Sequence, residues 1–130
     1  MLLGLGTFGR SYKLSSTRLH GPYAPITGPG IHDGVMTFAQ VCEFIRHGAQ
    51  VNYVREAQVP YAHKTLDWVS YENEQSLAVK VRWLLQEGFL GLMTSSLNQD
   101  DWGGQCRKDG LTFPLHRTIN RILRMNALLN

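Results

Sequence analysis

Two short apolar runs stand out in the hydrophobic pattern of the chain. Leu2–Tyr12 begins apolar, continues through glycine and threonine, and ends polar. Leu90–Leu97 is a second apolar run, and the polar stretch Asn98–Gly110 follows it. Such runs indicate strands buried on both faces, as in parallel sheets. We therefore predict two doubly buried parallel strands, each opening into a loop.

Three segments have the apolar spacing of helices and begin with capping signals. Thr37 and Gln40 have the spacing of a capping box at the start of the first helix. Asn73 suits the N-cap of a second helix that runs to Gln86, and Pro114 suits the first turn of a third. The core-facing stripes are Val41, Phe44 and Ile45 in the first helix, Leu77, Val81, Leu84 and Leu85 in the second, and Leu115, Ile119, Ile122 and Leu123 in the third.

The residues between the first strand and the second helix have the pattern of a small α+β lobe. Lys13–Gly34 contains three prolines and four glycines, which predicts a loop. Gln50–Arg55, Gln58–His63 and Asp67–Tyr71 are short runs rich in Val, Tyr and Trp, separated by gaps of turn length. They predict an antiparallel meander.

The predicted order is strand, inserted lobe, helix, strand, helix. Two parallel strands close neither a barrel nor a full sheet and leave hydrogen-bonding edges, so the pattern predicts part of a larger fold. Sites in parallel α/β folds lie at the carboxyl ends of strands. We therefore expect chemistry near Met93–Asp101 and at Arg10, although Arg10 equally suits pairing with a structural carboxylate.

Composition limits the classes of partner. The 130 residues suffice for one domain with a core, and 13 basic against 10 acidic residues give a net charge of +3. The longest basic run is Arg107–Lys108, so the chain lacks the clustered basic patch typical of nucleic-acid binding. No apolar stretch approaches the ~20 residues of a membrane span. Met1–Leu5 is too short for a signal-peptide core, so we expect no signal peptide in this chain.

Cysteine and histidine spacing does not indicate a metal site. The five histidines are scattered, and Cys42 and Cys106 do not form a C-x-x-C motif. We expect neither a metal nor a cofactor. The cysteines suit both inert core thiols and one long-range disulfide, and spacing alone leaves both alternatives open.

Three runs of the chain match longer motifs in order and spacing. The run GLGTFGRSYKL is similar to G-x-P-T-Y-G-R-S-F, and VPYAHKTLDWVSYENEQSL is similar to V-P-Y-A-Y-x-G-x-x-W-V-G-Y-D-x-x-x-S-x. The run GLMTSSLNQDDWGGQC, followed by FPL, is similar to G-A-M-V-W-A-x-D-x-D-D-F-x-G-x-C and F-P-L. Together these runs resemble the glycoside hydrolase family 18 chitinases over nearly the whole chain.

The resemblance implies an α/β fold, the C-terminal part of a (β/α)8 TIM barrel that carries an inserted α+β lobe. Residues 1–12 correspond to barrel strand seven, 13–71 to the lobe, and 72–130 to a helix, strand eight and the final helix. Chitinases of this kind are secreted, and Cys42 and Cys106 fall on family cysteines that pair. The resemblance therefore implies a disulfide and an extracellular location.

The resemblance also implies substrate-binding residues. Arg10 corresponds to a strand-seven arginine that contacts sugar, and Phe8 stands where the family has tyrosine. Met93 corresponds to a methionine that lines the cleft. Ser95 replaces the tryptophan that forms the floor beneath the reacting sugar. His32 aligns with a sugar-contacting glutamate of the lobe.

The catalytic motif of the family is absent from this sequence. Family 18 catalysis needs D-x-x-D-x-D-x-E after strand four, where the final glutamate protonates the leaving oxygen. No segment of the chain has that pattern, and Asp100 and Asp101 fall where the family has structural acids. We therefore predict no catalytic residue and no chitinase activity for this chain.

Three functional hypotheses follow. In the first, the chain is part of a chitinase-like protein that binds chitin or N-acetylglucosamine oligosaccharides without efficient hydrolysis, together with an N-terminal barrel segment. In the second, it is the C-terminal portion of an active secreted endochitinase whose acids lie on that segment. In the third, it is a truncated product without independent function. Replacement of the floor tryptophan by Ser95, together with Phe8 in place of the family's tyrosine, favours the first.

Overall fold

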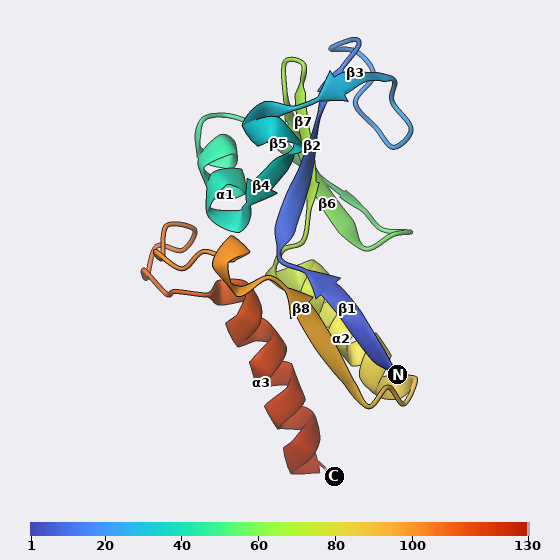
Figure 1. The fold of residues 1–130 in the computed structure, drawn as a ribbon, viewed down its shortest axis with the longest axis vertical. Coiled ribbons are helices and arrows are strands. Elements are labelled where there is room, and N and C mark those ends of the chain that lie inside the picture. The colour runs from blue at the N-terminus through green and yellow to red at the C-terminus, as the bar shows by residue number, and fades with distance from the viewer. Residues whose placement is uncertain (130) are drawn as a thin grey trace.

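The computed structural model describes residues 1–129 and has two parts, a barrel piece and a lobe, at opposite ends of an elongated molecule (Figure 1). The barrel piece contains two parallel strands and two α-helices, and the lobe contains a six-stranded sheet and one α-helix. In chain order the elements are β1 (Leu2–Gly6), β2 (Phe8–Leu14), β3 (Ile26–Pro29), the 3-10 helix η1 (Ile31–Gly34), β4 (Val35–Thr37), α1 (Phe38–Arg46), β5 (Gln50–Val54), β6 (Val59–Lys64), β7 (Asp67–Tyr71), α2 (Glu74–Gln86), β8 (Gly91–Ser95), the 3-10 helix η2 (Leu97–Gln99) and α3 (Pro114–Leu129).

The helix starts confirm the capping signals of the sequence. The Thr37 side chain accepts the Gln40 N–H at 3.2 Å, and the Gln40 side chain accepts the Thr37 N–H at 2.9 Å, which completes a capping box. Asn73 caps α2 in the same way through Ser76. Pro114 begins α3 as expected. These signals are local, so the sequence alone suffices to place the helices.

The lobe sheet has the strand order β3-β2-β7-β6-β5, and β4 also pairs with β2. The predicted antiparallel meander is confirmed as β5, β6 and β7. One face of the sheet packs against α1. The contact is close at Gly9 of β2, where an added Cβ would lie 2.7 Å from Val69 of β7 and 3.2 Å from Val41 of α1. Side chains alternate along a strand, so the two neighbours of Gly9 in β2, Phe8 and Arg10, belong to the opposite face of the sheet.

The expectation of a single strand over Leu2–Tyr12 is wrong. β1 pairs in parallel with β8 and ends at Gly6, whereas β2 pairs with β7 and begins at Phe8. Thr7 is the fully buried residue between them. The chain stays extended as it changes partners, so the sequence contains no turn signal at this point.

The segment Lys13–Gly34, which the sequence predicted as a loop, contains β3 and η1. β3 pairs with the outer end of β2, where Pro29 lies opposite Tyr12. Proline is tolerated there because β3 is an edge strand of the lobe sheet. Proline and glycine content thus identified the turns of this segment but concealed its short strand.

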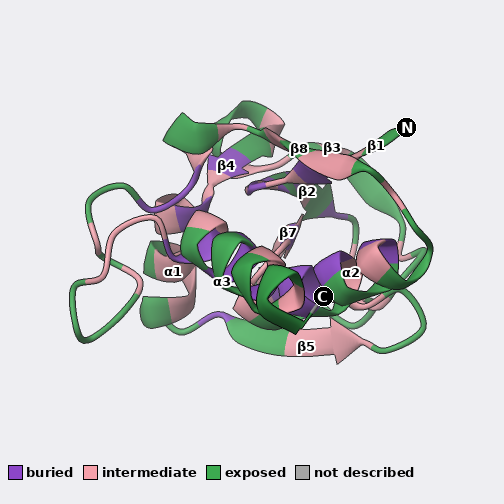
Figure 2. Ribbon diagram, turned by 90° about the horizontal axis from the view of Figure 1, so that it is seen from below, coloured by how far each residue is buried: buried purple, intermediate pink, exposed green. Residues whose placement is uncertain are grey.

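The prediction of doubly buried strands is also wrong for the described residues. In β1, Leu5 is buried against the helices, but Leu2 is 62% exposed, and Met93 of β8 is 59% exposed. The helices α2 and α3 carry buried residues along one side and exposed residues along the other (Figure 2). They cover one face of the two-stranded sheet, and its other face stays open.

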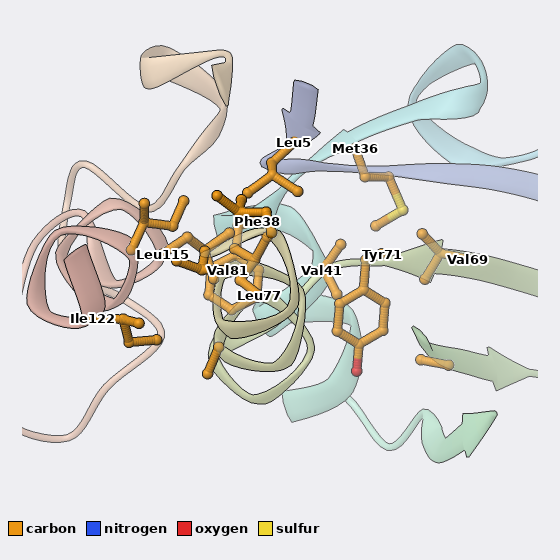
Figure 3. Close-up of a cluster of buried hydrophobic side chains, with 14 of the residues drawn as sticks. Leu5, Met36, Phe38, Val41, Val69, Tyr71, Leu77, Val81, Leu115 and Ile122 are labelled. Carbon is orange, nitrogen blue, oxygen red and sulfur yellow. The ribbon is translucent and has the colours of Figure 1, made fainter. Parts of the chain in front are cut away.

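One apolar cluster joins the two parts of the molecule (Figure 3). Leu5 of β1 and Leu115 of α3 belong to the same cluster as Phe38 of α1 and Val69 of the lobe sheet. The barrel piece and the lobe therefore share a core. This shared core fixes the start of β2 relative to the barrel piece.

Candidate functional site

An open cavity of about 280 Å³ lies where the lobe sheet meets the barrel piece. Arg10 is exposed in this cavity, and its guanidinium carbon lies 5.5 Å from the centroid of the Phe8 ring. Among the described residues, Arg10 forms no ion pair, so the alternative role of balancing a structural carboxylate is not observed. The cavity is lined by Gly6, Phe8, Arg10, Val59, Ser70, Tyr71 and Glu72.

Ser95 is held at the edge of this cavity. In the parallel register, Ser95 lies opposite Gly6, which lines the cavity, and Met93 lies opposite Gly4. The Thr7 N–H donates to the Ser95 carbonyl at 2.9 Å, and the Thr7 hydroxyl donates to the Ser96 carbonyl at 2.6 Å. The peptide bond between these two serines is cis. Met93 and Ser95 are both exposed, on the side of β8 that the helices leave open.

His32 lies apart from this cavity. It belongs to η1, has φ 55° and ψ 38°, and does not line the cavity that contains Arg10. Its exposed ring lies with Nδ1 3.2 Å from the Gln40 amide nitrogen, beside the start of α1. The structure therefore brings Phe8 and Arg10 together, places Ser95 beside Gly6 of the same cavity, and leaves His32 outside this cavity.

Ser70 and Glu72 line the cavity but were missed by reasoning from the sequence. Ser70 of β7 lies opposite Arg10 of β2. Glu72 follows the same strand, pairs with Lys80 and accepts the Ser76 hydroxyl at 2.5 Å, so both of its carboxylate oxygens are engaged. The alternation of β7 could have assigned both residues to one face, but only the strand register places them beside Arg10.

Tyr71 contributes the buried side of the cavity. It is 5% exposed, and burial raises the pKa of its phenol to about 12. The phenol therefore stays protonated and neutral throughout the physiological pH range.

Asp100 and Asp101 are fully buried and serve the structure. Asp100 Oδ2 accepts the backbone N–H of His116 at 2.9 Å and lies 2.8 Å from its ring Nδ1, so this carboxylate occupies the start of α3. Asp101 Oδ2 accepts the Cys106 N–H at 2.7 Å. The ring Nε2 of His116 lies 2.9 Å from the Thr94 hydroxyl of β8, a contact that the sequence did not suggest. Neither acid is accessible to a substrate.

Cys42 and Cys106 form a disulfide with a Cα–Cα distance of 5.4 Å. This confirms the pairing that the family resemblance implied. The bond joins α1 of the lobe to the loop that precedes α3, across 64 positions of sequence. It therefore links the lobe to the barrel piece covalently at a second place.

Within residues 1–129, no group of three or more His, Cys, Asp or Glu side chains is arranged to hold a metal ion. In the same part of the chain, no helix is long and apolar enough to cross a membrane.

Comparisons with known proteins define the class to which this chain belongs. Residues 1–100 match the family described as glycosyl hydrolases family 18. Chitotriosidase-1 of Mus musculus is 32% identical over 131 residues, which cover 96% of this chain and 27% of that protein. The Group IV chitinase of Ostrinia furnacalis, solved in complex with allosamidin, has a TM-score of 0.89 at 30% identity. The match covers 95% of this chain and 35% of the chitinase chain. Human YKL-39, described as a pseudo-chitinase with retained chitooligosaccharide binding properties, has a TM-score of 0.87 at 31% identity. The match covers 95% of this chain and 35% of that one.

The chain therefore belongs to glycosyl hydrolase family 18, and its fold is a part of the family's TIM barrel together with an inserted α+β lobe. It is a chitinase-like domain, and its structural neighbours include proteins that bind chitooligosaccharides. The chain spans between 23% and 32% of the length of the curated relatives it matches.

Proposed function

We propose that this chain forms one wall of a cleft that binds chitin or N-acetylglucosamine oligosaccharides and does not hydrolyse them by itself. The observation that carries the proposal is the unpaired, exposed guanidinium of Arg10 beside the Phe8 ring in an open cavity. Phe8, Arg10 and Ser95 are the proposed contacts at the barrel mouth. Met93 lines the open side of β8. His32 is proposed as a contact on the family resemblance alone, since it lies outside this cavity beside the start of α1.

The chemistry of these side chains suits a sugar. A pyranose has an apolar face, which stacks on an aromatic ring, and a rim of hydroxyl and acetamido oxygens, which accept from a guanidinium. Phe8 supplies the ring and Arg10 the donors. Ser95 offers a small hydroxyl where the family has an indole, so the cleft lacks the floor that favours a distorted sugar.

The absence of activity is proposed from the carboxylates of the chain. Protonation of a glycosidic oxygen needs an accessible carboxylic acid. Glu72 is the acid among the residues that line the Arg10 cavity, and Lys80 and Ser76 engage both of its carboxylate oxygens. Asp100 and Asp101 are buried. The motif D-x-x-D-x-D-x-E occurs nowhere in the sequence. In an active relative, those acids would come from another part of the barrel. We propose that this N-terminal barrel segment is the partner that covers the open face of β1 and β8.

We also propose that the protein works outside the cell. The Cys42–Cys106 disulfide supports this, because disulfides persist in oxidising compartments and are rare in the cytosol.

Binding of chitohexaose, measured by isothermal titration calorimetry, tests the proposal. We expect Arg10→Ala to weaken binding by about tenfold or more, since a hydrogen bond to a charged group contributes roughly 1.5–3 kcal/mol. Arg121→Ala is the matched control, because it removes the same charge from the exposed surface of α3, which does not line the cavity. Equal binding by the two variants would contradict the assignment of the site.

A turnover assay tests the catalytic part separately. We expect residues 1–130 to release no more fluorophore from a fluorogenic chitobiose substrate than buffer does. Hydrolysis above that background would show that an acid of this chain is catalytic.

A further inference from the structure

A second hollow of about 250 Å³ lies on the same open face of the lobe sheet, further from the barrel piece. Its aromatic side chains are Trp68 of β7 and Tyr61 of β6. Pro22 and the exposed Ala57 of the β5–β6 turn lie at its edge. We call this hollow the Trp68 pocket.

The Trp68 pocket adjoins the cavity that contains Arg10. Val59 and Ser70 line both. Ser70 of β7 lies opposite Arg10 of β2 and opposite Tyr61 of β6. These three residues form one row across neighbouring strands, which leads from Arg10 to the aromatic side chains of the pocket. The two hollows are therefore neighbours on one face of the lobe sheet.

The aromatic side chains of the pocket are held in place before any ligand binds. The Trp68 and Tyr61 rings lie 5.4 Å apart between centroids, with an angle of 25° between their planes. The indole N–H of Trp68 donates to the His20 carbonyl at 2.9 Å, and the Tyr61 hydroxyl lies 3.2 Å from His20 Nδ1. Their polar atoms are thus engaged by the protein, and a rigid aromatic surface costs little entropy on binding.

We propose that the Trp68 pocket binds a further pyranose ring of a β-linked N-acetylglucosamine oligosaccharide whose other units occupy the Arg10 cavity. The proposal rests on the proposed function of that cavity. A repeating chain of amphipathic rings fits both hollows, because each unit offers polar oxygens to Arg10 and an apolar ring face or acetamido methyl group to Trp68. Ser70, between the two hollows, supplies a hydroxyl at the linkage.

The test compares the affinities for chitotriose and chitohexaose by calorimetry in the whole chain. In the wild type we expect chitohexaose to bind at least about fivefold more tightly, on the scale of one stacked ring. Ala57→Arg places a long side chain at the mouth of the pocket, and we expect it to abolish this difference and leave chitotriose binding unchanged. Ala127→Arg, which adds the same charge on the exposed surface of α3, is expected to preserve the difference.

A second measurement follows the pocket directly. In ¹⁵N-labelled protein we expect chitohexaose, and not chitotriose, to shift the indole N–H resonance of Trp68, which Trp68→Phe identifies by its loss. If Ala57→Arg keeps the length dependence, or weakens both ligands equally, the pocket is not a separate subsite although the Arg10 cavity still binds sugar. Failure of the wild type to bind either oligosaccharide would overturn the proposed function as well. An indole shift with N-acetyl-phenylalaninamide but none with chitohexaose would assign the pocket to a peptide and overturn the proposal.

Discussion

Removal of the Cys42–Cys106 disulfide should lower the free energy of unfolding by about 4 kcal/mol. The bond closes a loop across 64 positions of sequence, and the chain-entropy relation for a loop of that length gives about 4 kcal/mol at 25 °C. The loop contains β5, β6 and β7 of the lobe, all of α2 and all of β8. The unfolded chain without the bond therefore gains freedom over half of its length.

Urea denaturation followed by far-UV circular dichroism measures this effect. The double variant Cys42→Ser with Cys106→Ser is compared with the oxidised wild type, and the reduced wild type serves as the control for the two serine side chains. With a slope of about 1.5 kcal/mol per molar, the transition midpoint should fall by roughly 2–3 M. Because small domains have only about 5–15 kcal/mol of stability, the variant is expected to be close to unfolding at low urea.

A loss of less than about 1 kcal/mol in the double variant would refute the reasoning. It would mean that the unfolded chain already keeps α1 close to the loop before α3, so that the covalent bond removes little freedom. A loss in the double variant that the reduced wild type does not share would point instead to packing of the serine side chains.

Two further predictions concern the crossover and the lobe. Thr7→Val should lower the free energy of unfolding by about 1–3 kcal/mol, because it leaves the Ser96 carbonyl without the buried hydroxyl that donates to it. Urea unfolding measures this loss, and Thr17→Val, at an exposed position, is the control. Equal stabilities of the two variants would contradict the prediction. Burial and the stacked His20 ring, 3.8 Å away between centroids, lower the pKa of His63 in the folded chain below its usual value of about 6.5. The unfolded chain therefore takes up the proton first, and the stability that His63 contributes is complete above about pH 6.5 and is lost as the pH falls below it. Melting temperatures of the wild type, His63→Gln and the exposed His47→Gln between about pH 7.5 and pH 5 check this, and an acid loss that His63→Gln retains in full would disprove it.

The elements set by neighbouring residues could be predicted from the sequence. The capping box of Thr37 and Gln40 and the stripe Leu77, Val81 and Leu84 lie within one helix each, and the structure has both helices where the pattern predicts them. Both signals depend on spacing along the chain, which a sequence contains in full.

The features that the sequence missed depend on the choice of partner strand. The residues from β1 to β2 read as one strand because the backbone stays extended through Thr7, and only the partners, β8 and then β7, distinguish its two halves. The same reason applies to the site. Phe8 and Arg10 could be named from their motif, whereas Ser70 and Glu72 join them through the register of β2 with β7. The disulfide needed the family resemblance, since spacing alone left two alternatives.

The open strand edges of the barrel piece have a consequence for handling the protein. Within residues 1–129, β1 and β8 pair only with each other, so each has one unpaired row of N–H and C=O groups, beside the exposed Leu2 and Met93. Such edges add strands from other molecules, including identical copies. The yield of refolded monomer should therefore fall as protein concentration rises, and dilute refolding at low temperature, which weakens apolar association, should favour the monomer.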